Sequence, residues 1–199
     1  MNTNKTNHRS LAFSLQLSAF SLFFAGCGLP AIEPAQVDEV RLFTLSAPPV
    51  EVSSGERVRV KPVELAGHLR RRELAVRVAE NEVAYLENAR WAEPLDTAIT
   101  NLLEARLVAI GRGGSIEVKV LRCEPLRFKD NTVLFAGTYT ITWDSDPTRS
   151  NAGMFASRPR VWDGRDRAAL VGLLREAVNE MGDDLAKNLS ADLHPAGSP

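Results

Sequence analysis

Residues 116–143 read IEVKVLRCEPLRFKDNTVLFAGTYTITW, and two alternating apolar patterns in this stretch decide the fold. The first half places Ile116, Val118 and Val120 on one side. The second half repeats the alternation, and its apolar residues are Val133, Phe135, Tyr139, Ile141 and Trp143. Alternation of this kind is typical of strands with one buried face. With a two-residue turn at Asp130-Asn131, both patterns fall on the same face of an antiparallel hairpin.

That turn also predicts which residues oppose each other. The predicted pairs are Phe128–Val133, Leu126–Phe135, Val120–Ile141 and Val118–Trp143. On this register Cys123 lies on the other face, beside Thr138. Pro125 cannot donate a ladder hydrogen bond, so we expect a bulge or a sheet edge there.

Shorter patterns around the hairpin predict the remaining elements. We expect strands at 40–45, 57–61, 74–78 and 83–86, a helical turn at 65–71, helices at 94–110 and 166–189, and a loop at 144–160. Pro94 suits the first helical position, and Gly111 follows the last apolar residue of that helix. The predicted fold is α+β, an α/β sandwich in which two helices pack on a mixed, largely antiparallel sheet. We expect one globular domain at 40–190 and a disordered tail at 191–199.

The last predicted helix carries a continuous apolar stripe. Its members are Leu170, Leu174, Val178, Met181, Leu185 and Leu189. Their spacing of three and four residues is typical of a core-facing helix. Asp163 is the expected N-cap, with Asp166 in the capping-box position.

The N-terminus has the features of a bacterial lipoprotein signal. Basic residues precede an apolar run from Leu11 to Ala25, and the run ends in Gly26-Cys27. We therefore expect residues 1–26 to be removed as a signal peptide and Cys27 to carry the lipid, with 27–39 as a tether. By resemblance to Gram-negative lipoproteins, Gly28 after the lipidated cysteine indicates the outer membrane.

Composition excludes several classes of protein. The formal net charge is −1, with 24 basic and 25 acidic residues, so a nucleic-acid partner is not expected. Two cysteines cannot form a disulfide framework or a four-thiolate zinc site. No histidines have metal-ligand spacing, so we expect neither a metal nor another cofactor.

Few residues are candidates for chemistry. A catalytic triad would have to use His68, and no serine stands in a G-x-S-x-G elbow. Arg70, Arg71 and Arg72 form the densest basic cluster after residue 27, which suits contact with lipid headgroups or an acidic partner. The carboxylates of Glu176, Glu180 and Asp184 form a ridge on the last helix, either solvated or a docking surface. We expect Cys123 to be a small strand residue. The residues alone do not favour an enzyme.

The segment Arg90-Trp91-Ala92-Glu93-Pro94-Leu95-Asp96 resembles the signature of the ABC-type transport auxiliary lipoproteins, the PqiC-like family. Trp91, Pro94 and Leu95 carry the motif in a structural role. The resemblance implies an α/β sandwich similar to the N-terminal domain of TolB. It also implies a non-enzymatic component of intermembrane lipid transport, anchored in the outer membrane and facing the periplasm. The implied partners are an MCE-domain protein and a permease. Self-association into a ring would suit such a conduit.

Three other functions remain open at this point. A lipoprotein that itself binds a lipid or small apolar ligand would use a groove between sheet and helices. A structural envelope assembly factor would need the anchor but no transport partner. A hydrolase would depend on His68.

Overall fold

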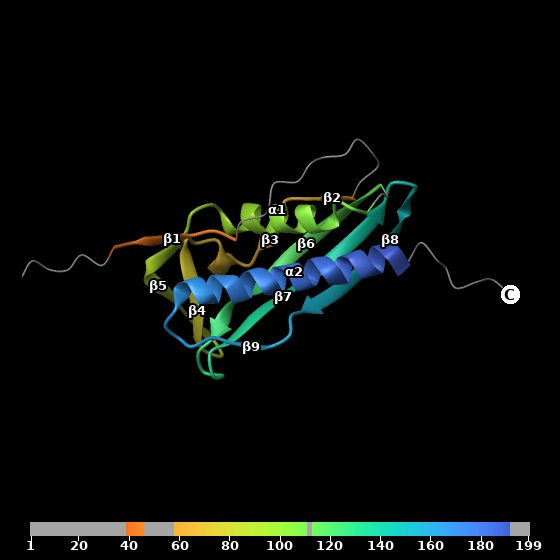
Figure 1. The fold of residues 1–199 in the computed structure, drawn as a ribbon. Helices are drawn as coiled ribbons and strands as arrows, with labels where there is room; N and C mark the ends of the chain where they lie inside the picture. The colour runs from red at the N-terminus through yellow and green to blue at the C-terminus, as the bar shows by residue number, and fades with distance from the viewer. Residues whose placement is uncertain (1–38, 46–57, 111–112, 192–199) are drawn as a thin grey trace, which may run out of the picture. The chain divides into compact units, whose positions relative to one another are not determined.

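The computed structural model describes residues 39–45, 58–110 and 113–191, which lie in one compact unit. Within them a mixed sheet has the strand order β1-β5-β4-β6-β7-β8, with β2 and β3 also paired to β6 and β9 to β7 (Figure 1). The strands are β1 (Arg41–Phe43), β2 (Val58–Val60), β3 (Glu64–Leu65), β4 (Glu73–Ala79), β5 (Glu82–Trp91), β6 (Gly114–Leu126), β7 (Thr132–Trp143), β8 (Asp146–Ala156) and β9 (Arg160–Val161). The predicted α+β class with a mixed, largely antiparallel sheet is confirmed.

Two α-helices, α1 (Leu95–Leu107) and α2 (Arg167–Ala191), lie against the same face of the sheet (Figure 1). They also pack on each other: a Cβ atom built at Gly182 of α2 would lie 2.8 Å from Cγ of Arg106 on α1. Every residue of the predicted α2 stripe is at most 2% exposed. Apolar burial between the helices and the sheet therefore forms the core. Neither helix has the length and apolarity needed to cross a bilayer, within the described residues.

The helix caps differ from the prediction by a few residues. Pro94 is the N-cap of α1, with an extended ψ of 133°, instead of its first helical residue. At the start of α2, the Asp166 carboxylate accepts hydrogen bonds from the backbone N–H groups of Ala168 and Ala169, so Asp166 is the cap. Asp163 accepts from residues 165 and 166 and orders the preceding turn instead.

The β6–β7 hairpin exists, but the predicted register is wrong. Ile116 opposes Ile141, Val118 opposes Tyr139 and Val120 opposes Gly137. The connection is a longer turn over 127–131, in which Asp130 and Asn131 have φ angles of 50° and 54°. At the end of the hairpin far from the turn, the observed register differs from the predicted one by four residues. Because four is an even number, the same side chains still face the helices.

A register shift between Val120 and Arg122 divides β6 into two parts. The bulge or sheet edge predicted at Pro125 does not lie there, because Pro125 pairs with Val133 inside the ladder. Because one extra residue reverses the side-chain alternation, Cys123 points into the core opposite Phe135 and is 3% exposed. The prediction that Cys123 lies on the opposite face, beside Thr138, is therefore wrong.

The predicted loop at 144–160 is also wrong. Residues 146–156 form β8, which pairs antiparallel with β7 and ends the strand order. Most of its side chains are exposed, so the segment lacks the apolar alternation that identifies a half-buried strand. Gly153 on this strand lies against the Tyr139 ring, because a Cβ atom built there would be 2.5 Å from it. The close packing therefore accounts for a glycine at this position.

Candidate functional site

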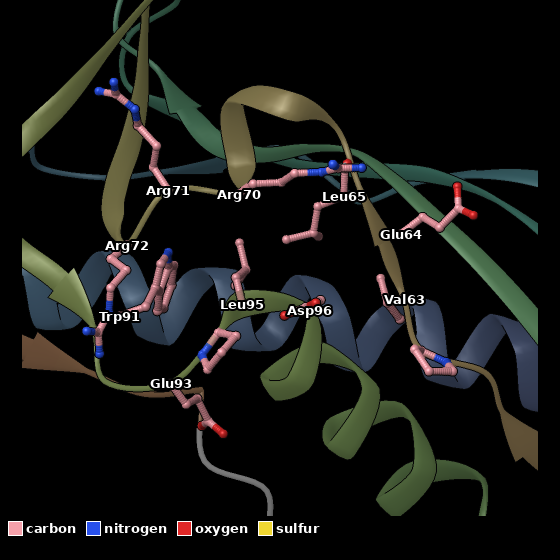
Figure 2. Close-up of a pocket in the computed structure, with 12 residues that line it drawn as sticks. Val63, Glu64, Leu65, Arg70, Arg71, Arg72, Trp91, Glu93, Leu95 and Asp96 are labelled. Atoms are coloured by element: carbon pink, nitrogen blue, oxygen red, sulfur yellow. The ribbon is translucent and has the colours of Figure 1, made fainter.

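Two groups of residues that the sequence suggested separately lie around one pocket. Arg70, Arg71 and Arg72 form one wall, and the motif residues Trp91, Pro94 and Leu95 form another (Figure 2). The cavity has a volume of about 700 Å³. It lies between the β3 segment, the end of β5 and the first turn of α1.

The path of the chain beside β6 creates this pocket. Strands β2, β3 and β4 all pair parallel with β6, one after the other. Between β3 and β4 the chain leaves the sheet through the 3-10 helix η1 (Gly67–Leu69) and returns through the three arginines. The backbone N–H of Trp91 donates to the Arg72 carbonyl at 2.7 Å, which joins the returning segment to the end of β5.

The floor of the pocket is apolar and rigidly held. Trp91, Leu95, Val63 and Leu65 are each no more than 6% exposed. Strand β5 extends to Trp91, so this residue ends the strand and packs in the core shortly before α1. The backbone N–H of Val63 donates to the Thr100 hydroxyl at 3.2 Å, which ties the β3 segment to α1.

The three arginines are exposed but point in different directions. Arg70 extends across the pocket and its Nε donates to the Leu65 carbonyl at 3.2 Å (Figure 2). Arg72 runs alongside Trp91, whereas Arg71 turns away from the pocket (Figure 2). The guanidinium of Arg71 lies 4.7 Å from the centroid of the Tyr85 ring, a cation–π contact.

Three carboxylates also border the pocket. Glu93 accepts a hydrogen bond from the Thr44 hydroxyl at 2.7 Å, and Asp96 accepts from the backbone N–H of Thr97 at 2.9 Å. Figure 2 shows the Glu64 and Glu93 side chains directed away from the space between Arg70 and Trp91. Two of the three carboxylates therefore point out of the pocket, whereas Asp96 stays beside Leu95 at its lining.

Sequence reasoning missed a buried charge cluster centred on Glu124. This carboxylate is 0% exposed, yet it accepts from Nε of Arg77 at 3.0 Å and from Nη1 of Arg122 at 3.2 Å. It also accepts from the backbone N–H of Cys123 at 2.7 Å. A signal existed in the sequence: Glu124 is the single charge in the run Cys123-Glu124-Pro125-Leu126, which is buried throughout.

His68 belongs to the same cluster. Its Nε2 lies 3.5 Å from Oε2 of Glu124, and its carbonyl accepts a hydrogen bond from the Tyr85 hydroxyl at 3.1 Å. These contacts hold η1 two residues before Arg70 and so position the arginine segment. The partner of the His68 ring is therefore the Glu124 carboxylate, and not a serine hydroxyl as a catalytic triad would require.

Burial changes the chemistry of Cys123. Removal from water, reinforced by the negative charge of Glu124, raises the pKa of the thiol far above its ordinary value. The thiolate is the reactive form of cysteine, so this side chain stays an unreactive core group near neutral pH.

The acidic ridge of α2 is engaged within the chain. Glu180 accepts from Nε of Arg158 at 3.0 Å and from Nη2 of Arg160 at 2.8 Å. Glu176 lies 3.4 Å from Arg160, and the Asp184 carboxylate accepts a long contact from Asn188. Residues 158–160 therefore contact two of the three carboxylates of the ridge, Glu176 and Glu180.

Several predicted features are not part of the pocket or of the Glu124 cluster. Cys27, the signal segment and the tether up to residue 38 lie outside the described residues, as does the tail from 192. Across residues 39–45, 58–110 and 113–191, no three His, Cys, Asp or Glu side chains are grouped so as to hold a metal ion.

Comparison with known proteins gives a match to one family over part of the chain, and a fold. Residues 43–116 match the family described as ABC-type transport auxiliary lipoprotein component, which confirms the resemblance. The matched stretch contains every residue that lines the pocket. No protein of the curated collection matches the chain significantly.

Two crystal structures share the fold. A protein described as uncharacterized is 15% identical, with a TM-score of 0.62, and the match covers 76% of this chain and 99% of that one. Protein XCC0632 from Xanthomonas campestris, of family DUF330, is 16% identical with a TM-score of 0.59, covering 73% and 92%. At these identities the likeness shows the architecture alone.

Proposed function

We propose that this chain, whose residues 43–116 match the ABC-type transport auxiliary lipoproteins, is a membrane-tethered, non-catalytic component of an intermembrane lipid transport system. The observation that carries the proposal is this match. It includes the Trp91 motif and the arginine segment, which meet at one end of the sheet. A component of this kind acts by position, so it needs a surface and an anchor and not a nucleophile.

The finer proposal concerns where the protein is held. A lipid on Cys27 would anchor it in the outer membrane, with the folded part in the periplasm. The segment 28–39 would reach roughly 40 Å if fully extended, at about 3.3 Å per residue. Tethering of this kind raises the local concentration of the folded part for an MCE-domain protein that arrives with its permease from the other membrane.

The anchor can be tested by labelling cells that produce the full chain with an alkyne analogue of palmitate. We expect label on the wild type and on Cys123→Ala, and none on Cys27→Ala. Cys123→Ala is the matched control, because it removes the other thiol and leaves the signal intact. An uncleaved signal could hold Cys27→Ala at the inner membrane, so label incorporation is the primary measurement. Label on Cys27→Ala would refute the anchor.

The partner is tested separately. Chemical crosslinking in intact cells, followed by purification of the tagged full chain, should retrieve an MCE-domain protein encoded by the same organism. Cys27→Ala should retrieve much less of it, because the chain is no longer held at the outer membrane. Equal retrieval by both variants would contradict a role that depends on tethering.

A further inference from the structure

The two edges of the sheet are protected to very different degrees. Strand β1, at one end of the strand order, is 3 residues long and contains Arg41. Strand β8, at the other end, is 11 residues long, and within the described residues no strand pairs with its outer side (Figure 1). Proteins commonly prevent an edge strand from pairing with another chain by keeping it short, charged, bulged or interrupted by proline. The length of β8 therefore calls for such a feature along it.

The features that block an edge are confined to the first four residues of β8. Asp146, Pro147 and Arg149 lie there, and the pairing with β7 shifts register at the same place. From Ser150 to Ala156 the strand contains no charge and no proline, and it pairs one-to-one with residues 136–142. Most of these residues are exposed. This regular, uncharged half of β8 is suited to the addition of one more strand.

We propose that β8 binds a second copy of this chain, with residues 150–156 of the two copies paired antiparallel around a two-fold axis at Gly153. Gly153 is the middle residue of the segment, so a register centred there pairs the whole segment of one copy with the whole segment of the other. A two-fold contact of this kind is complete with two copies. It therefore differs from the head-to-tail contact that a ring requires.

The side chains of the segment are complementary to those of a second copy. Met154 is 76% exposed, and in this register it lies opposite Ala152 of the other copy. A large side chain opposite a small one fits without a clash and removes apolar surface from water. Arg149 lies opposite Ser157, so the two arginines do not face each other, which would destabilise the pair. The strand thus matches its own copy in both size and charge.

The side chains that would meet lie on the face of the sheet that the helices leave open. Met154 and Ala152 pair with Thr138 and Thr140 of β7, and these two threonines alternate with Tyr139. The Tyr139 hydroxyl accepts a hydrogen bond from the α2 side chain of residue 188 at 2.8 Å, so Tyr139 is on the helix side. Met154 and Ala152 are therefore on the opposite side (Figure 1). The contact combines backbone pairing along the edge with side-chain packing on the open face.

Introduced cysteines test the register directly. Full chains with Ala152→Cys and full chains with Met154→Cys, each with a different tag, are produced in the same cells. Copper phenanthroline is then added as the oxidant to an extract in mild detergent. We expect a reducible species of two chains that contains both tags, because opposed residues of paired strands lie within the Cα separation that a disulfide spans. Each variant produced alone is the matched control, because its cysteine then faces Met154 or Ala152 of the other copy.

A charge on the edge tests the pairing without a crosslink. Ala152→Lys places a lysine on each copy next to the axis, where like charges repel and where lysine blocks edge pairing. Purification of one tagged full chain should then retrieve about tenfold less of a second, differently tagged copy than the wild type does. Leu42→Lys on β1 is the control: the side chain is 64% exposed at the other edge, so retrieval should stay within about twofold. Both positions are exposed, so equal thermal unfolding temperatures will show that folding is intact.

Three results would overturn the inference. Crosslinking of the mixed variants that is no stronger than that of either variant alone would exclude the register. Equal retrieval by Ala152→Lys and the wild type would exclude β8 as the contact. If a chain with both cysteines links into trimers and larger species, the contact is head-to-tail, because a two-fold contact joins the same two copies twice. The pairing does not depend on the anchor, and none of these outcomes bears on labelling at Cys27.

Discussion

The two parts of β6, on either side of its register shift, are stabilised in different ways. In the first part, Gly114–Val120, apolar residues face the helices while Glu117 and Lys119 are exposed. In the second part, residues 123–126 are all buried, and one of them is the charged Glu124. The first part is stabilised mainly by apolar burial, and its charged side chains stay in contact with water. The second also depends on the pairing of one carboxylate with specific cationic partners.

This difference predicts different responses to the same substitution. A buried ion pair contributes little compared with an apolar pair of the same shape, but loss of one partner leaves an uncompensated charge away from water. An exposed pair of the same type is solvated in either case. The position of the charge, more than its presence, decides the cost.

The largest effect is expected for Glu124→Gln. The substitution keeps the shape but removes the negative charge that Arg77 and Arg122 contact, so the free energy of unfolding should fall by about 3–5 kcal/mol. Urea denaturation measures this loss. We expect the slope of the unfolding free energy against urea concentration to be the same for the variant and the wild type.

Glu117→Gln is the matched control, because it makes the same change seven residues earlier on the same strand. Glu117 pairs with Lys61, and both side chains are more than half exposed, so the loss should be at most about 1 kcal/mol. Equal losses in the two variants would show that burial of Glu124 has no particular importance.

The same comparison explains what the sequence predicted correctly. Alternation in residues 116–120 identified the strand and its buried face, because a one-sided environment leaves a period of two in the sequence. Beyond Arg122 the strand is buried on both sides, so the period disappears. A turn of five residues resembles a turn of two when only Asp130-Asn131 is considered, and the register was therefore wrong. β8 was missed for the opposite reason, since most of its side chains face water.

The candidate site was predicted in its parts but not as a whole. Arg70, Arg71 and Arg72 stand out by charge, and Trp91 with Pro94 stands out as a motif. Nothing in their spacing shows that they meet, because this depends on η1 leaving the sheet between β3 and β4. Glu124 gives only a weak signal, since its partners Arg77 and His68 lie 47 and 56 residues away in the chain.

A second prediction concerns the register shift itself. Gly137 lies opposite Val120, where a Cβ atom would be 2.6 Å from the backbone oxygen of Lys119. Gly137→Ala must move the backbone of β6 next to the bulge, so we expect the free energy of unfolding to fall by about 1–3 kcal/mol. The measurement is again urea denaturation.

Gly172→Ala gives a control of opposite sign. A Cβ atom there meets nothing within 4 Å, and the position lies inside α2, so alanine should stabilise the protein by about 0.5–1 kcal/mol. If Gly137→Ala is equally well tolerated, the two strands are not held closely together at the bulge.

The smallest expected effect concerns Glu180, a carboxylate that is more buried than Glu117 and less buried than Glu124. The Glu180 side chain is 20% exposed. Its burial, the largest single influence, would raise its pKa. Hydrogen bonds from Arg160 and Arg158, together with their charges, outweigh this influence and hold the pKa below its ordinary value of 4.5. Because the folded state has the lower pKa, this interaction stabilises the protein fully above about pH 4.5 and is lost as the pH falls through the folded-state pKa.

Glu180→Gln should therefore lower stability at pH 7 by about 1 kcal/mol or less, and the difference from wild type should shrink below pH 4.5. Thermal unfolding at a series of pH values between 7 and 3 measures this. Glu176→Gln is the control: it contacts Arg160 at 3.4 Å, but its side chain is 64% exposed, so its curve should stay close to wild type. Parallel curves for Glu180→Gln and wild type would mean that solvent screens this pair as fully as the exposed one at Glu117. Only the buried part of β6 would then depend on charge pairing.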